Sequence, residues 1–315
     1  MSTEQRRDFL KKSIFGAATL TVPSAMITKN TRGDDSSVAV TPFSTDPTAL
    51  VNLTDTIKCT RIGFGTGMIG YNQSSELTRM DHEEALKVLG FAYDNGIRFF
   101  DMADLYGTHS IVSEYLAGKP RDEYTLVSKY WPHPGGIPDE VRGSVDEVVK
   151  RFLKELKTDY IDVVQIHCMS DPDWDTKLAA EMEALERLKE QGLIRAHGIS
   201  THSVAAVRRG AELDWTDVMH VRINTTGARM DGTLEENLDV FNLAHQNGKG
   251  LIAMKIIGEG TIKDPEERRR SVDLTLRVPA IDVLVVGFLA CSEISEFLTN
   301  VEASLKEMEK ELQKA

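Results

Sequence analysis

The chain has 315 residues, of which 41% are hydrophobic and 27% are charged, a balance typical of a soluble globular protein. This composition excludes a fibrous protein, a bundle of membrane helices and a small scaffold held by disulfides. Lys and Arg total 37 against 49 Asp and Glu, and the resulting net charge of -12 repels phosphate backbones, so we expect no nucleic-acid partner.

The N-terminus has the pattern of an export signal. Arg6 and Arg7 are followed by a short, weakly apolar run that ends at Val22, and Ala25 closes a Pro-Ser-Ala stretch of small residues. The adjacent arginines resemble the twin-arginine signal, whose pathway exports folded proteins. We therefore predict that residues 1–25 are a signal peptide read by the export machinery. The alternative is an amphipathic surface helix or a frayed terminus.

This signal implies a periplasmic or otherwise extracytoplasmic location. The apolar run is too short to span a bilayer, so we expect no stable membrane anchor after cleavage of the signal. Residues 26–54 are rich in Thr, Ser, Asp and Pro without periodicity, and they predict a flexible linker.

From residue 55 onward, short β-branched runs alternate with longer helical patterns, as in parallel βαβ units. The predicted strands are Arg61–Gly63, Arg98–Asp101, Tyr124–Ser128, Tyr160–Ile166, Ile194–Ser200, Val218–Ile223, Leu251–Met254 and Val283–Val286. The predicted helices are His82–Asn95, Ser110–Ala117, Pro138–Leu156, Lys177–Gln191, Ser203–Leu213, Leu234–Gln246, Glu266–Leu276 and a last one from about Ser292.

Eight such units favour an α/β fold, a single-domain (β/α)8 TIM barrel over residues 55–315. A closed barrel of this kind needs about 250 residues. A doubly wound open sheet is the structural alternative, but no GxGxxG sequence follows a strand and opens a helix.

Ionisable residues end three successive predicted strands. Asp101, Lys129 and His167 stand at or directly after these ends, and Tyr106 follows Asp101 by five residues. Because the carboxyl ends of barrel strands meet at one rim, we expect the four side chains to converge. Taken singly, Asp101 and Lys129 could form a structural ion pair, and His167 could be a core histidine.

Together the four side chains make a coherent acid site. An ammonium near a phenol favours the phenolate, so Lys129, positioned by Asp101, is expected to lower the pKa of Tyr106 from its usual value near 10. His167 would orient a substrate oxygen. A tyrosine acid aimed at a carbonyl suggests hydride transfer from a cofactor.

Four segments carry a family resemblance. Gly63–Gly67, Gly96–Gly107, Ser128-Lys129 and Gln165–His167 resemble the linked motifs of the aldo-keto reductases over residues 57–300. The resemblance implies a barrel that reduces an aldehyde or ketone with a nicotinamide dinucleotide. It also implies Asp101, Tyr106, Lys129 and His167 as the catalytic tetrad.

The resemblance also implies the cofactor-binding positions. They are Gly65, Thr66, Gly67, Asp101, Ser200, Thr201, Asn224, Met254, Lys255, Ile257, Gly258 and Gly287. Thr201 stands where the family often has Asn, Asn224 substitutes for a Gln, and Met254 stands near the usual place of a stacking aromatic. The cation that pairs with the 2′-phosphate of NADP is missing after Gly287, and Glu293 and Glu296 follow, so NADP and NAD both remain possible cofactors.

Other cofactors and functions remain open or are disfavoured. Cys59, Cys168 and Cys291 form no CxxC pair, and we expect no metal site. Cys168 is either a reactive thiol or an inert buried one. The partner we expect is a small carbonyl compound, with sugars among the candidates. The alternative function is a non-catalytic binding or regulatory module that keeps the barrel.

Overall fold

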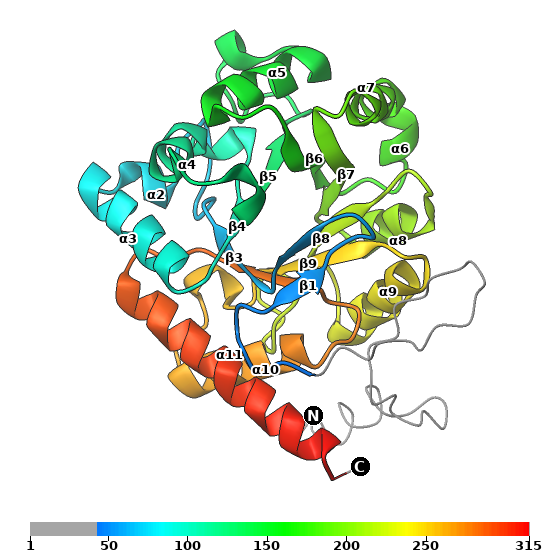
Figure 1. The fold of residues 1–315 in the computed structure, drawn as a ribbon. Helices are drawn as coiled ribbons and strands as arrows, with labels where there is room; N and C mark the ends of the chain where they lie inside the picture. The colour runs from blue at the N-terminus through cyan, green and yellow to red at the C-terminus, as the bar shows by residue number, and fades with distance from the viewer. Residues whose placement is uncertain (1–42, 315) are drawn as a thin grey trace, which may run out of the picture.

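The structure is a computed structural model that describes residues 43–314. The predicted signal peptide and most of the predicted linker lie outside the described residues. Eight parallel strands form a closed barrel in the order β10-β3-β4-β5-β6-β7-β8-β9 (Figure 1). The strands are β3 (Ile62–Gly65), β4 (Phe99–Asp101), β5 (Thr125–Tyr130), β6 (Ile161–Met169), β7 (Ile194–Thr201), β8 (Val218–Arg222), β9 (Gly250–Met254) and β10 (Val283–Val286). The predicted single-domain (β/α)8 barrel is confirmed.

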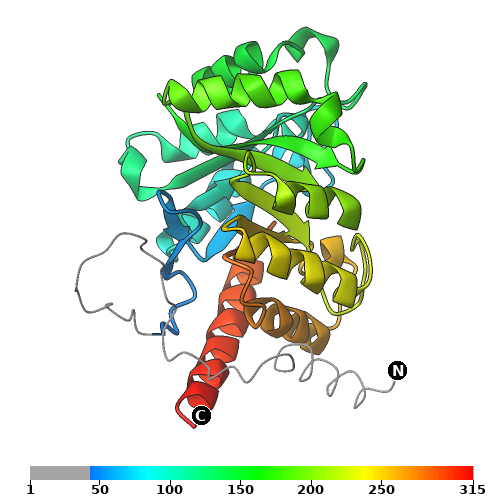
Figure 2. The ribbon, with the colours of Figure 1, turned by 90° about the vertical axis from the view of Figure 1, so that its right-hand side faces the viewer.

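Helices surround the barrel (Figures 1 and 2). They are α2 (Glu76–Arg79), α3 (His82–Asp94), α4 (His109–Leu116), α5 (Val145–Leu156), α6 (Trp174–Lys177), α7 (Ala179–Glu190), α8 (Val204–Glu212), α9 (Leu234–Gln246), α10 (Pro265–Leu276) and α11 (Cys291–Leu312). Short 3-10 turns are η1 (Asp104–Tyr106), η2 (Arg121–Glu123), η3 (Asp139–Val141) and η4 (Gly258–Gly260). No helix among the described residues is long and apolar enough to cross a membrane.

Local signals explain where several helices start and stop. Ser144 and Thr233 cap α5 and α9 through capping boxes with Glu147 and Glu236. The α5 helix therefore begins at Val145, seven residues later than Pro138, where we predicted it to begin. Gly96 follows the C-cap residue of α3 with a φ of 91°, a left-handed conformation that glycine adopts without strain.

A small hairpin departs from the sequence prediction. Strands β1 (Leu50–Asn52) and β2 (Lys58–Thr60) pair antiparallel inside and next to the segment we predicted to be a linker. A buried cluster joins the hairpin to the barrel. It contains Leu53, Ile57 and Cys59 together with inward-facing residues of the barrel strands, Phe99 and Val127 among them. The hairpin thereby covers the end of the barrel opposite the carboxyl rim, and regular structure begins earlier than residue 55.

The composition of the hairpin explains why the sequence did not predict it. Its strands have three residues each and include Asn52, Lys58 and Thr60, so they show no apolar alternation long enough to indicate a strand. The hairpin is stabilised by the burial of Leu53 and Ile57 against side chains from several barrel strands, and these long-range contacts leave no pattern in the local sequence.

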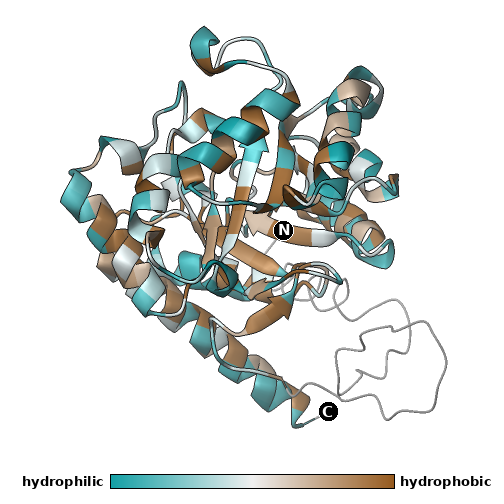
Figure 3. Ribbon diagram, turned by 45° about the horizontal axis from the view of Figure 1, so that its top comes forward, coloured by the Kyte–Doolittle hydropathy of each residue, from teal (hydrophilic) through white to brown (hydrophobic). Residues whose placement is uncertain are grey.

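The alternation of strand side chains separates the core into two parts. Phe99 and Val127 point into the barrel, whereas Phe100 and Leu126 pack outward against the helices. Colouring by hydropathy shows hydrophobic residues concentrated in the central strands, while the surrounding helices alternate between hydrophobic and hydrophilic residues (Figure 3). Two residues beyond Phe99 and Val127, the same inward face carries Asp101 and Lys129, so the alternation places both at the open rim.

Candidate functional site

The four predicted catalytic side chains meet at the carboxyl rim of the barrel. Lys129 Nζ donates to Asp101 Oδ1 and, at 2.9 Å, to the backbone oxygen of Met102. Tyr106 Oη and His167 Nε2 are 3.3 Å apart, and Lys129 Nζ lies 5.4 Å from the centre of the Tyr106 ring. The structure therefore brings Asp101, Tyr106, Lys129 and His167 into one cluster.

The charges of this cluster are set by burial and by one ion pair. Burial raises the pKa of Asp101, but Lys129 and His220 outweigh it and hold that pKa well below its usual range. Burial lowers the pKa of Lys129, while Asp101 raises it; the net shift is downward. The site therefore contains a carboxylate that stays ionised and an ammonium that is held by it.

The pKa of Tyr106 differs from the sequence prediction. Burial, followed by the negative charge of Asp101, raises the pKa of Tyr106 well above 10, so the lowering that we predicted from Lys129 does not prevail. Burial and the charge of Lys129 lower the pKa of His167 well below its usual value. Near neutral pH the site thus holds a protonated phenol beside a neutral imidazole, two groups able to donate hydrogen bonds.

The loop that carries Tyr106 is fixed on both sides. Asp104, buried two residues before Tyr106, accepts hydrogen bonds from Gln73 at 2.9 Å and from Arg151 at 2.8 Å. A Cβ atom added at Gly67 would lie 2.3 Å from the Tyr106 ring, so only glycine lets this loop pass the ring closely. Gly67, which we predicted to contact the cofactor, thus also leaves room for the Tyr106 ring.

Sequence reasoning missed the support behind Asp101. His220 on β8 is fully buried; its Nε2 lies 3.2 Å from Asp101 Oδ1, and its Nδ1 lies 2.6 Å from Gln165 Oε1. Gln165 Nε2 in turn donates to the oxygen of Val218 at 3.1 Å. The alternation of β8, which turns His220 to the same inner face as Arg222, was the signal that could have identified it.

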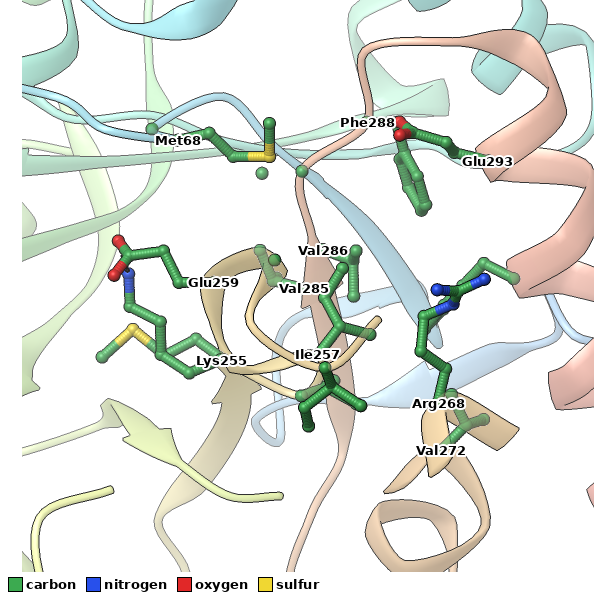
Figure 4. Close-up of a pocket in the computed structure, with 18 of the residues that line it drawn as sticks. Met68, Lys255, Ile257, Glu259, Arg268, Val272, Val285, Val286, Phe288 and Glu293 are labelled. Carbon is green, nitrogen blue, oxygen red and sulfur yellow. Dashed lines mark hydrogen bonds and ion pairs between the residues drawn. The ribbon is translucent and has the colours of Figure 1, made fainter. Parts of the chain in front are cut away.

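A cavity of about 380 Å³ opens beside this cluster (Figure 4). Its lining joins Asp101 and Tyr106 to the loop after β9 and to the first turns of α11. Seven predicted cofactor positions line it: Gly65, Gly67, Asp101, Met254, Lys255, Ile257 and Gly287. At Gly287 an added Cβ would lie 2.7 Å from the Met68 sulfur, so glycine keeps the wall open there.

The other predicted cofactor positions do not line this cavity. They are Thr66, Ser200, Thr201, Asn224 and Gly258. Thr66 Oγ1 donates to the backbone oxygen of Asp101 at 2.9 Å, and Thr201 Oγ1 donates to the backbone oxygen of His220 at 2.8 Å. Ser200 Oγ accepts from Cys168 N at 2.9 Å.

Asn224 likewise serves the fold of its loop. Its Nδ2 donates to the backbone oxygens of Ala228 at 2.7 Å and Lys255 at 3.1 Å, and its Oδ1 accepts from Thr226. This side chain joins the loops that follow β8 and β9. The amide is therefore committed to backbone partners rather than open to the cavity.

Charged residues that the sequence did not single out line the outer part of the cavity. Arg268 of α10 lies there beside Glu296 of α11, with Nη2 2.7 Å from Glu296 Oε1. Glu259 and Lys263 also line the wall. The described residues contain no group of three His, Cys, Asp or Glu side chains placed to hold a metal ion.

Cys168 has an imidazole partner. Its sulfur lies 3.4 Å from His202 Nε2, and burial raises the pKa of its thiol to about 11. The thiol is thus protonated at neutral pH, which favours the inert alternative over a reactive thiolate.

The cavity suits a phosphate-bearing ligand such as a nicotinamide dinucleotide. Lys255, Lys263 and Arg268 supply cations along its wall, the glycine positions keep it open, and Tyr106 lines it together with Asp101. A volume of this size falls within the range of small-molecule sites.

Comparison with known proteins agrees with this geometry. The family model described as "Aldo/keto reductase family" matches residues 61–311. A D-threo-aldose 1-dehydrogenase of a Pseudomonas species is 25% identical over 234 residues, covering 66% of this chain and 69% of that protein. An L-galactose dehydrogenase of Arabidopsis thaliana is 29% identical over 225 residues, covering 66% of this chain and 65% of that protein.

The fold has close counterparts among solved structures. An aldo/keto reductase from Klebsiella pneumoniae, solved in complex with NADP and acetate, superposes with a TM-score of 0.62 at 17% identity. The superposition covers 82% of this chain and 94% of the other. At this identity the likeness concerns the fold.

The buried position of His220 generates a prediction. In His220→Leu, Asp101 loses the imidazole that lies 3.2 Å from its Oδ1, so we expect kcat to fall about 10- to 100-fold, the scale of one polar contact with a charged group. The pKa of Asp101 should rise, so the loss of turnover on the acid side should begin at higher pH. His220→Gln, which keeps a donor group, should recover most of both effects.

His197 provides the matched control, because it is equally buried but stacks on Trp215 and pairs with Glu186 away from the cluster. His197→Gln should lower the melting temperature without moving the pH profile. Identical pH profiles for wild type and His220→Leu would contradict the role given to His220.

Proposed function

Because the chain belongs to the aldo-keto reductase family, a family of oxidoreductases, we propose that it reduces an aldehyde or ketone group to an alcohol with a nicotinamide cofactor. One observation carries the proposal: the Tyr106 hydroxyl and His167 Nε2, 3.3 Å apart, meet beside the buried Lys129–Asp101 pair at the inner end of the cavity.

The chain's own residues divide the chemistry among them. Tyr106 Oη gives its proton to the carbonyl oxygen, and His167 Nε2 donates a hydrogen bond that orients the same oxygen. Lys129, held by Asp101, stabilises the phenolate that Tyr106 becomes after it has lost its proton. The nicotinamide cofactor supplies the hydride; Lys255 and Lys263 would hold its diphosphate, and Arg268 would face the 2′ position of its ribose.

Polyhydroxy carbonyl compounds are the substrate class we favour. Two relatives are described as dehydrogenases of aldoses or of L-galactose, which are sugars with an aldehyde carbon. The same four side chains serve sugar oxidation in the reverse direction, in which Tyr106 accepts the proton. Support for this substrate class comes from those two relatives.

The proton donor can be tested directly. We expect Tyr106→Phe to lower kcat for carbonyl reduction at least about 100-fold, since general acid catalysis contributes on the order of 10²–10⁴. NADH binding, followed by the fluorescence of the reduced nicotinamide, should change less than about twofold. Tyr71→Phe is the control, because Tyr71 is an exposed tyrosine of the neighbouring loop.

Undiminished turnover in Tyr106→Phe would refute the assigned acid. The alternative of a non-catalytic module predicts that the wild-type protein shows no turnover with a panel of sugars, steroids and small aldehydes. Failure of NADH and NADPH alike to bind in calorimetry would also favour it.

We propose that NAD is preferred over NADP. Arg268 is the cation of α10 that faces the cavity, and it is already paired with Glu296 and with the oxygen of Lys263. A 2′-phosphate must compete with the Glu296 carboxylate for this guanidinium, whereas the 2′-hydroxyl of NAD need not.

Removing that carboxylate should shift the preference. We expect Glu296→Gln to lower the ratio of the NADPH to the NADH dissociation constant about tenfold, equivalent to about 1.4 kcal/mol. Glu302→Gln, which removes a carboxylate from the same helix but pairs with Lys306, should leave the ratio unchanged. An unchanged ratio in Glu296→Gln would show that Arg268 does not read the 2′ position.

We also propose that the protein is exported in folded form with its cofactor bound. The support is the Arg6-Arg7 pattern and the weakly apolar run after it. Replacing both arginines by lysine should leave the protein in the cytoplasmic fraction, while Lys11→Arg and Lys12→Arg together should not. Equal periplasmic amounts of the wild-type protein and both double variants would contradict the proposal.

A further inference from the structure

The loop that follows β9 holds an unusual backbone and an ion pair at the cavity wall. Lys255 and Glu259 both adopt left-handed conformations, with φ of 60° and 57°, which side chains other than glycine rarely take. Both residues line the cavity. Figure 4 shows their side chains together, Lys255 reaching the Glu259 carboxylate. Such strained positions cluster at ligand clamps and switches.

The Glu259 carboxylate is shared by two cations from different loops. Lys255 Nζ lies 2.7 Å from Glu259 Oε1, and Arg229 Nε lies 3.2 Å from Glu259 Oε2. Arg229 belongs to the loop after β8 and is left-handed as well, with a φ of 61°. One carboxylate thus bridges two rim loops beside the cavity.

The surroundings of this carboxylate are positive although the chain is strongly acidic. Arg222 lies nearby and pairs with Asp231 at 3.1 Å, so Arg222, Arg229 and Lys255 face two carboxylates, Asp231 and Glu259. Burial raises the pKa of Asp231 to about 6, which weakens its share of the negative charge toward acid pH. Burial raises the pKa of Glu259, but Lys255, Arg229 and Arg222 bring it below the usual value, so Glu259 is ionised.

We propose that Lys255 and Arg229 form a subsite for the diphosphate of a nucleotide, and that Glu259 is a built-in anion that occupies this subsite until the ligand replaces it. The inference rests on the proposed function, because it concerns the diphosphate of the dinucleotide. Glu259 acts as a competitor rather than as a ligand-binding residue.

The physical reason is that two anions cannot share these cations without repulsion. A diphosphate that pairs with Lys255 and Arg229 must push Glu259 away, and the free energy of that ion-pair exchange is subtracted from binding. Since Glu259 sits on a strained backbone in a short turn, a change of its conformation is local. Neutralising Glu259 should therefore tighten diphosphate binding, the opposite of what removal of an ordinary structural ion pair would do.

The test compares ADP with adenosine by calorimetry, so that only the diphosphate differs. In Glu259→Gln we expect the dissociation constant of ADP to fall at least fivefold and that of adenosine to stay the same. NADH should follow ADP. Lys255→Met and Arg229→Gln should each weaken ADP binding, and Lys255→Met should cancel the gain when it is combined with Glu259→Gln.

Glu293→Gln is the matched control, because Glu293 lines the same cavity but accepts backbone hydrogen bonds from Leu289 and Ala290. If it tightens ADP binding as much as Glu259→Gln does, the effect is a general loss of negative charge and the exchange is refuted. Unchanged or weaker ADP binding in Glu259→Gln also overturns the proposal, as does a failure of ADP to bind either protein.

These outcomes are distinct from failure of the proposed function. If the wild-type protein binds NADH and reduces carbonyls but Glu259→Gln does not bind ADP more tightly, only the proposed exchange of anions is refuted. If Glu259→Gln binds ADP more tightly, as predicted, but the wild-type protein transfers no hydride, only the proposed reductase function is refuted. If Glu259→Gln melts at a lower temperature than wild type, the dissociation constant of ADP for Arg229→Gln provides the second measurement. This substitution changes an exposed side chain, and it should weaken ADP binding.

Discussion

The ion pair between Lys129 and Asp101 is the constraint on which the site depends. Both side chains are buried, and a buried charge is tolerated only when it is paired and hydrogen-bonded. The pair ties β4 to β5 at the rim; Lys129 Nζ also donates to the oxygen of Met102, and His220 Nε2 lies 3.2 Å from Asp101 Oδ1. Removing either charge would leave the other unpaired inside the barrel, so these groups hold fixed positions under any ligand that enters the cavity.

This constraint explains why the tyrosine keeps its proton. Tyr106 lies beside Asp101 at the inner end of the cavity, and burial together with the carboxylate charge raises the pKa of the phenol. Lys129 is close enough to stabilise a phenolate once it forms, but its charge is already shared with Asp101. The arrangement favours a neutral donor before proton transfer and a stabilised anion after it, which is what differential stabilisation of the transition state requires.

Strand geometry determines how much of the site could be predicted from the sequence. Asp101, Lys129 and His167 could be placed at one rim because barrel strands run parallel and their side chains alternate with a period of two. The same reasoning could not show that Asn224 is committed to backbone oxygens, since the partner of a side chain depends on how loops far apart in sequence pack. Nor could it show the left-handed turn at Lys255, because this residue type carries no preference for that conformation.

The charges around the cavity show how an acidic protein can bind a phosphate-bearing ligand. Lys255 and Arg229 are paired with Glu259, and Arg268 is paired with Glu296, so these cations are neutralised before a ligand arrives. Internal carboxylates lower the cost of holding several cations close together, and they also remove the attraction that would otherwise draw in any anion. Binding then requires exchange of partners rather than simple attraction, so a ligand must satisfy several cations at once. The same competition lowers the affinity for a dinucleotide, because Glu259 and Glu296 take back the cations when the ligand leaves. The folded export that we propose requires the cofactor to travel with the protein, since reduced nicotinamide is made in the cytoplasm. The other contacts of the cavity must therefore outweigh the cost of this exchange.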